Sequence, residues 1–161
     1  MASVTIPFLT LHDRFMMYDR ERAGGGDVAA IDRHGGLLAY TDLAGEAGVL
    51  WMRNAGRSRE LLLTVEVGAP AGGLDAQVAY EGRMEIVTGS LIAQDGVLNE
   101  LVGEQVVAPG VHQIQVRVAG REEAEAATEA WVEAYLALPN TPSKIEEIPR
   151  GPEHWWVTFL D

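Results

Sequence analysis

The chain contains no cysteine among its 161 residues. Disulfides, thiol nucleophiles, cysteine-bound zinc and iron–sulfur clusters are therefore excluded. A chain of this length buries roughly 70% of the surface that its unfolded form exposes, so it can build a core without a disulfide or a metal. We expect a single β-sandwich domain over residues 1–161, and we expect no cofactor.

Long apolar runs are also missing. No segment approaches the roughly 18 apolar residues that a membrane helix needs. The N-terminal residues alternate polar with apolar and lack the basic start and apolar stretch of a signal peptide. Lysine occurs once, at Lys144, in a chain rich in Arg, Ala and Gly, which is typical of a GC-rich bacterial genome. We expect a cytoplasmic bacterial protein with no membrane partner.

Basic residues are scarce, and the net charge is −12. Residues 1–60 hold seven Arg and eight acids, whereas residues 61–161 hold five basic residues and sixteen acids. The second part therefore supplies −11 of the total. Such a surface repels nucleic acid and anionic membrane and attracts basic partners at long range. Acidity that only keeps the protein soluble is the alternative explanation.

The most frequent pattern in the sequence is the alternation of polar and apolar residues. Leu61, Leu63, Val65 and Val67 share one face of a segment, and a period of two is typical of a half-buried strand. The same pattern and the turn signals between segments, such as Asp95-Gly96, predict a two-layer antiparallel β-sandwich of jelly-roll type. The expected strands are residues 3–11, 14–19, 37–42, 47–53, 60–67, 76–87, 90–94, 97–101, 111–119, 131–138 and 154–160.

Residues 121–138 fit two structures. The first ten are good helix formers, and Ala127, Trp131, Tyr135 and Leu138 would line one helical face. The alternation of Val132 with later apolar residues instead fits a strand that ends at a proline. We favour an acidic loop with at most a short helix around residues 122–131, followed by a strand over 131–138.

No catalytic motif is found. The four histidines, at positions 12, 34, 112 and 154, lack the short spacing of a metal motif, and His112 is in phase with core residues. Gly24-Gly25-Gly26 lacks the Lys-Ser/Thr of a phosphate-binding loop. The carboxylate pairs fit solvated faces, although the fold can still assemble a hidden site from His12, His34, His112 or His154 and distant acids. The chain is expected not to be an enzyme, with no catalytic residue and no metal ligand assigned.

Two features indicate a binding role. Four acids, Glu122, Glu123, Glu125 and Glu129, fall within eight positions and form a candidate docking surface for an Arg- or Lys-rich partner. In His154-Trp155-Trp156, one indole is expected to face the core and the other to face outward or a second layer. We assign Trp155 as a candidate anchor for a partner. A solvated loop and a closing strand of the sandwich are the alternative explanations.

The stretch from Gly110 through His112 to Arg121, then the acidic spacer and Val132 to Pro139, is similar to a recurrent pattern in small acidic β proteins of actinobacteria and related bacteria. More distantly, the layout resembles the competence-protein J type of nuclease inhibitor. The segment Ser143–Asp161 departs from that type, and no functional residue carries over. The resemblance implies a β-sandwich and agrees with the charge, because inhibitors of basic nucleases are often acidic.

The sequence therefore predicts an acidic, non-catalytic binding protein, in particular an immunity or inhibitor protein for a basic nuclease or toxin. Two alternatives remain open. One is a structural module that self-associates through strand edges or the Trp155-Trp156 strand, giving a homo-oligomer. The other is a sandwich that binds a small molecule or carbohydrate, or a hydrolase whose acids the fold brings together.

Overall fold

The computed structural model describes residues 2–10, 14–22, 29–33, 37–41, 47–54, 59–95, 98–137 and 150–160. Its strands are β1 (Ala2–Thr10), β2 (Arg14–Asp19), β3 (Ala29–Arg33), β4 (Leu37–Thr41), β5 (Ala47–Arg53), β6 (Arg59–Val67), β7 (Gln77–Ile86), β8 (Leu91–Asp95), β9 (Leu98–Gly103), β10 (Gly110–Ala119) and β11 (Arg150–Leu160). A 3₁₀ turn covers Arg20–Arg22, and the helix α1 covers Arg121–Leu136.

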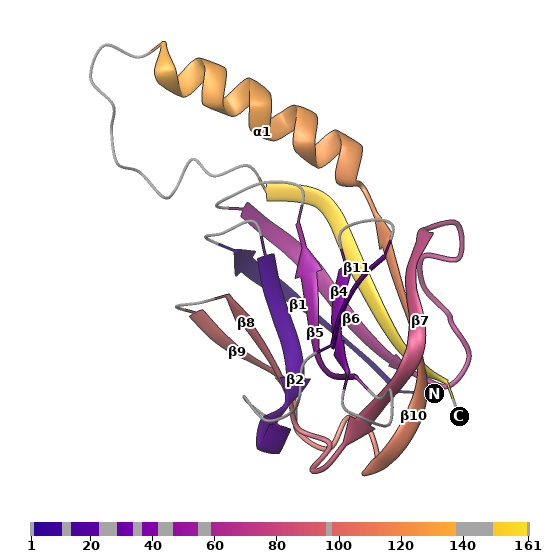
Figure 1. The fold of residues 1–161 in the computed structure, drawn as a ribbon. Helices are drawn as coiled ribbons and strands as arrows, with labels where there is room; N and C mark the ends of the chain where they lie inside the picture. The colour runs from indigo at the N-terminus through magenta and orange to yellow at the C-terminus, as the bar shows by residue number, and fades with distance from the viewer. Residues whose placement is uncertain are drawn as a thin grey trace.

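The strands form two packed layers (Figure 1). One layer has the order β1-β6-β11-β10-β7, and the other has the order β5-β2-β8-β9, with β4 also paired to β5 and β3 to β4. A short parallel pairing of β5 with β7, at Ala47 and Met84, connects the layers. The pairing is otherwise antiparallel apart from β11 with β6. The β-sandwich expected from the alternation is thereby confirmed.

The core lies between the layers and is built from the predicted faces. In β6, Leu61, Leu63 and Val65 are buried in the core, as alternation requires. Aromatic rings from both layers meet there: Phe15 of β2 lies 5.4 Å from Phe8 of β1, measured between ring centroids. This core holds the two sheets together because burying apolar area is the main favourable term in folding.

Two segments differ from the expectation. The segment β3 was not predicted, and the predicted strand over 131–138 is wrong, since Arg121–Leu136 forms one 16-residue helix. The high content of Ala and Glu explains the helix, because these residues lose little conformational freedom in it. The alternation after Val132 was a coincidence of spacing in a short stretch.

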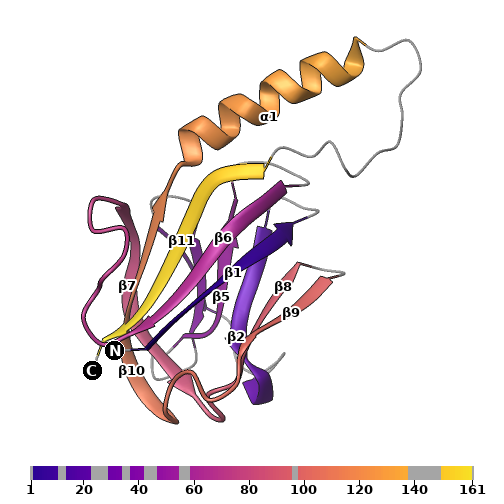
Figure 2. The same ribbon diagram turned by 180° about the vertical axis from the view of Figure 1, so that it is seen from behind.

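The helix α1 lies at one end of the sandwich, and both views show it running outward past the ends of the strands (Figures 1 and 2). Among the described residues, no helix has the length and apolar character needed to cross a membrane. At the β8–β9 hairpin, Asp95 pairs with Leu98. The predicted turn residue Gly96 lies outside the described residues.

Candidate functional site

The start of α1 is set by the residue before it. Gly120 has a φ of +74°, a conformation that other residues rarely adopt, and its carbonyl accepts a hydrogen bond of 3.0 Å from the Ala124 N–H. Glu122 and Glu123 occupy the first turn, where negative charge interacts favourably with the helix dipole. The chain therefore leaves β10 abruptly and continues as a helix.

One face of α1 packs on the sandwich, against β11. Ala124 is buried, and Thr128 and Trp131 are half-buried. Near the helix start, the guanidinium of Arg121 lies 5.7 Å from the centroid of the Trp155 ring and donates a hydrogen bond to the Arg53 carbonyl. These contacts hold the helix through one face, and most of its other described side chains are exposed.

Four glutamates share a second face of α1. Successive residues of a helix are rotated by about 100°, so spacings of three and four bring side chains to one side. Glu122, Glu125, Glu129 and Glu133 follow these spacings and are all exposed. We call these four residues the acidic stripe. Glu123 is also exposed but falls on a different side of the helix.

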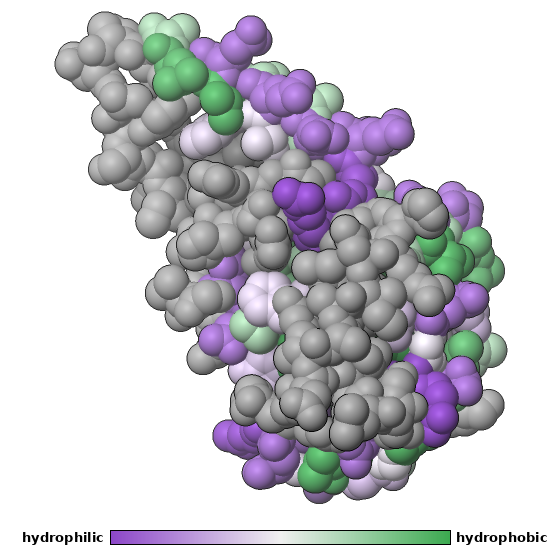
Figure 3. Space-filling view, viewed as in Figure 1, coloured by the Kyte–Doolittle hydropathy of each residue, from purple (hydrophilic) through white to green (hydrophobic). Residues whose placement is uncertain are grey.

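The acidic stripe is bordered by apolar side chains near the end of the helix. Val132 and Leu136 remain 41% and 73% exposed, respectively. In the space-filling view, hydrophilic atoms follow α1 and hydrophobic ones appear towards its C-terminal end (Figure 3). The helix carries five Glu against one Arg, a net charge of −4. The surface of α1 therefore offers both charge and exposed apolar atoms, the two kinds of contact that protein interfaces combine.

The four acids that the sequence assigned to one docking surface therefore do not all lie on one face of the helix. The structure brings Glu122, Glu125 and Glu129 onto one stripe, leaves Glu123 outside it and adds Glu133. The sequence reasoning missed Glu133 because residues 131–138 were assigned to a strand. A helical reading of the whole segment would have found it by spacing.

Trp155 is placed differently from what a partner contact requires. Its side chain is fully buried, lies 6.0 Å from Phe15 in an edge-on arrangement, and donates from Nε1 to Glu153 Oε1 at 2.7 Å. The register of β11 causes this, because Trp155 falls in phase with the core residues Val157 and Phe159. The assignment of Trp155 as a partner anchor is therefore corrected. Trp156 takes the outer face, as expected for one of the two indoles.

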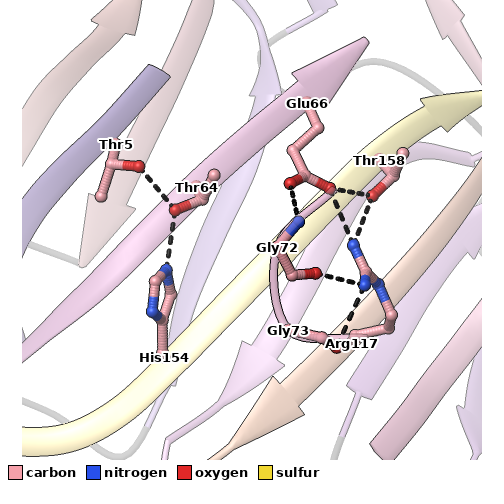
Figure 4. A network of polar contacts seen from close by, with 8 residues as sticks. All are labelled: Thr5, Thr64, Glu66, Gly72, Gly73, Arg117, His154 and Thr158. Carbon is pink, nitrogen blue, oxygen red and sulfur yellow. Dashed lines mark hydrogen bonds and ion pairs between the residues drawn. The ribbon is translucent and has the colours of Figure 1, made fainter. Parts of the chain in front are cut away.

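A polar cluster lies on the outer face of the first layer, on three adjacent strands (Figure 4). Arg117 of β10 donates from Nη2 to Glu66 Oε2 of β6 at 2.8 Å and to Thr158 Oγ1 of β11 at 3.0 Å. Thr158 in turn donates to Glu66 Oε2 at 2.9 Å. The side chains of Arg117 and Glu66 are each only 3% exposed. A buried ion pair on the outer face of a sheet requires a cover.

The loop between β6 and β7 provides that cover. Gly72 donates its N–H to Glu66 Oε1 at 2.7 Å, while Arg117 Nη1 donates to the carbonyls of Gly72 and Gly73. A Cβ on Gly73 would lie 2.8 Å from three ring atoms of Trp156, so the loop backbone rests directly on the indole. Arg117 stands between the core residues Val116 and Val118, so alternation alone places it on the outer face of its strand. Alternation could not show that a loop folds back over it.

His154 lies beside the polar cluster, on the side of the edge strand β1, and with Thr64 and Thr5 it forms a polar row. Its ring stacks on Trp156 with a centroid distance of 3.6 Å, and its Nε2 is 2.7 Å from Thr64 Oγ1. Thr64 Oγ1 is 2.8 Å from Thr5 Oγ1 (Figure 4). Burial lowers the pKa of His154 below its ordinary value of 6.5, although the charge of Glu66 acts in the opposite direction. At neutral pH this histidine is therefore uncharged.

The other histidines do not join this row. His112 lies on the core-facing side of β10, where its Nε2 is 2.7 Å from the Ala108 carbonyl oxygen and its ring meets Phe159 edge-on. His12 and His34 lie outside the described residues. Within the part of the chain that the structure describes, no group of three or more His, Asp or Glu could hold a metal ion.

No family model matches the chain, and no curated protein matches it in sequence. Two solved structures are similar in fold. One, described as "Crocagin biosynthetic gene J", superposes with a TM-score of 0.50 at 13% identity, covering 99% of this chain and 98% of that one. The other is ComJ of Bacillus subtilis, described as an inhibitor of the DNA-degrading activity of NucA, with a TM-score of 0.48 at 8% identity, covering 100% and 96%. The chain thus shares its overall fold with the crocagin protein and is weakly similar to ComJ.

Proposed function

We propose that this protein is a non-catalytic binding protein that docks a basic protein partner on the acidic stripe of α1. The observation that carries the proposal is the position of the stripe. Four exposed carboxylates stand in line on a helix that is held to the sandwich by its opposite side. Such an arrangement is accessible along its length without any rearrangement of the core.

The charge of the whole chain supports a basic partner. The net charge is −12, so approach of a basic surface is favoured before contact. The stripe then adds local complementarity, which accelerates association and selects the partner more than it raises affinity. Val132 and Leu136 are exposed beside the stripe, so a bound partner can also bury apolar surface there.

A nuclease or toxin with a basic active-site surface is the class of partner that we favour. A surface that binds polyanionic substrate carries Lys and Arg, and an acidic helix can occupy it by the same electrostatics. The protein would then act as an inhibitor or immunity protein. The proposal rests on the charge and placement of α1 and not on the weak likeness to ComJ.

Self-association through the Trp155-Trp156 strand is less well supported. The strand β11 lies inside its sheet, paired with β6 on one side and β10 on the other, so it has no free edge. Sheet edges elsewhere would have to provide such a contact.

Affinity capture with matched charge reversals tests the proposal. The full-length protein is immobilised, exposed to extract of its host and washed at low and then high salt, and the bound proteins are identified by mass. A basic nuclease or toxin that is released by salt and lost in Glu129→Lys, but retained in Glu123→Lys, supports docking on the stripe. Equal capture by both variants, or recovery of no basic protein, contradicts it.

A further inference from the structure

The contacts beneath the β6–β7 loop are made to the backbone of two consecutive residues, Gly72 and Gly73. Arg117 Nη1 donates to two consecutive carbonyls, those of Gly72 and Gly73, and Glu66 Oε1 accepts the N–H of Gly72. Trp156 supplies a flat apolar surface against the same two residues. In these interactions, Arg117, Glu66 and Trp156 contact the backbone of the loop and none of its side chains.

The same contacts restrict which residues fit. A Cβ on Gly72 would lie 2.6 Å from Trp156 Nε1, and one on Gly73 would lie 2.8 Å from the ring. Distances this short exclude any side chain unless the indole or the backbone moves. The surface formed by Arg117, Glu66 and Trp156 therefore accepts two consecutive glycines.

The loop does not use every group that this surface offers. Among the described residues, Arg117 Nε is buried without a hydrogen-bond partner. A buried donor without an acceptor is unfavourable, and native structures contain few of them. A segment that also brought an acceptor to Nε would satisfy the arginine more completely than the loop does.

Glycines with positive φ stand at the start and in the middle of the loop, where they restrict the backbone less than other residues would. Gly68, at its start, has a φ of +102°, and a Cβ there would meet no atom within 4 Å, while Gly73 has a φ of +55°. Ala69, Ala71 and Leu74 are exposed, so the loop contributes little apolar burial of its own. Arg117 and Glu66 supply the polar contacts to the middle of the loop, while Gly68 at its start donates its N–H to the Phe159 carbonyl at 2.8 Å.

We propose that Arg117, Glu66 and Trp156 form a peptide-binding subsite for a Gly-Gly segment, which the β6–β7 loop occupies in this structure and which a segment of another chain can occupy in its place. This subsite lies on the outer face of the first layer and is independent of the acidic stripe. The loop acts as an internal competitor, so the apparent affinity for an external segment is reduced by the fraction of molecules in which the loop is closed.

The direct test uses the loop's own sequence as the probe. An acetylated and amidated peptide Ala-Pro-Ala-Gly-Gly, which repeats residues 69–73, is titrated into the full-length variant Gly73→Ala and followed by tryptophan fluorescence. The added methyl pushes the loop from Trp156, so we expect saturable binding that is about tenfold tighter than to the unsubstituted protein. The peptide Ala-Pro-Ala-Val-Val should not bind.

The matched control is Gly48→Ala, because a Cβ at Gly48 meets no atom within 4 Å and should leave the loop closed. Absence of saturable binding to a Gly73→Ala protein that melts as cooperatively as this control overturns the proposal. Equal binding of the Val-Val peptide also overturns it.

Hydrogen exchange on the unsubstituted protein tests the proposal even if Gly73→Ala fails to fold. The Gly72 amide, bonded to Glu66, should exchange by local opening at least about a hundredfold faster than the Val157 amide in the interior strand β11. Equal exchange rates would mean that the loop opens only when the whole protein unfolds, and the subsite could then not be reached by another chain.

Discussion

Arg117 Nη2 and Glu66 Oε2 lie 2.8 Å apart on the outer face of the sheet, where both side chains are buried. The two residues come from strands that are separated by β11, and they meet because Thr158 and the backbone of the β6–β7 loop complete the cluster. This ion pair therefore joins three strands and a loop.

Removing one partner of this pair should be strongly destabilising. In Glu66→Ala, the buried guanidinium keeps its desolvation cost and loses its counter-charge, which typically costs roughly 3–5 kcal/mol. The double variant Glu66→Leu with Arg117→Met should lose much less than the sum of the losses in Glu66→Leu and in Arg117→Met alone. Urea unfolding of the unsubstituted protein, the two single variants and the double variant measures the difference.

An exposed hydrogen bond between β10, the strand of Arg117, and its neighbour β7 is the control. Gln115 Nε2 donates to Glu81 Oε1 at 2.7 Å, but in solvent. Glu81→Ala should change the free energy of unfolding by only about 0.5 kcal/mol. A comparable loss at Glu81 and Glu66 would refute the importance that we assign to burial.

The contribution of Asp19 to the free energy of unfolding should depend on pH. Burial raises its pKa, but hydrogen bonds from the N–H groups of Glu21, Thr88 and Gly89 and from the Thr88 hydroxyl outweigh burial and bring the pKa below 3.8. The folded state therefore binds this proton less readily than the unfolded chain. Its stabilisation is present above pH 3.8 and is lost as pH falls through the folded pKa.

The variant Asp19→Asn tests this role. Hydrogen bonds to a charged group contribute about 1.5–3 kcal/mol, so we expect a loss of that size at pH 7. The loss should shrink when unfolding is measured at progressively lower pH below 3.8. A loss that is independent of pH would show that the charge of Asp19 is irrelevant.

His154 should make the stability depend on pH in a different window. Because the pKa of His154 is lowered in the folded state, the unfolded chain binds the proton more readily below pH 6.5. Stability from this group is complete above pH 6.5 and falls as pH drops toward the folded pKa. Melting temperatures between pH 7.5 and 5 should fall less in His154→Phe than in the unsubstituted protein. Identical slopes would contradict the assignment.

Gly89 should not tolerate a side chain. It has a φ of +81°, and a Cβ there would lie 2.2 Å from the Val107 carbonyl oxygen. Gly89→Ala should therefore lose about 1–3 kcal/mol of stability from strain in thermal unfolding. Gly48→Ala, which has open space and no positive φ, should stay within about 1 kcal/mol. Similar losses in both variants would argue against the close packing at Gly89.

The sequence predicted the sandwich well because its strands are half-buried. The alternation of Leu61, Leu63 and Val65 identifies the core-facing side of the strand. This inference depends only on the two-residue period of a strand, so it does not require knowing which strands are its neighbours. The strand containing Trp155 and Trp156 was likewise recognised. Its register decided which indole is buried, and the sequence could not fix that register.

The site could be predicted only in part, because it depends on contacts distant in sequence. Arg117 has a polar strand position like that of Gln115, yet a loop some 45 residues earlier in the chain buries only the arginine. For α1, helix and strand periods both fitted a short segment, and packing of Ala124 against the sandwich favours the helix. The acids were therefore identified, but their arrangement as a stripe was not.

Docking of a basic partner on the acidic stripe is the central claim. Its most direct test measures the association rate and affinity of the captured partner for Glu129→Lys and for Glu123→Lys, which change the charge equally on different sides of one helix. We expect Glu129→Lys to weaken binding about tenfold, mainly through slower association at low salt, and Glu123→Lys to do so far less. Equal effects of the two reversals would mean that only net charge attracts the partner, and the stripe would then not be its docking site.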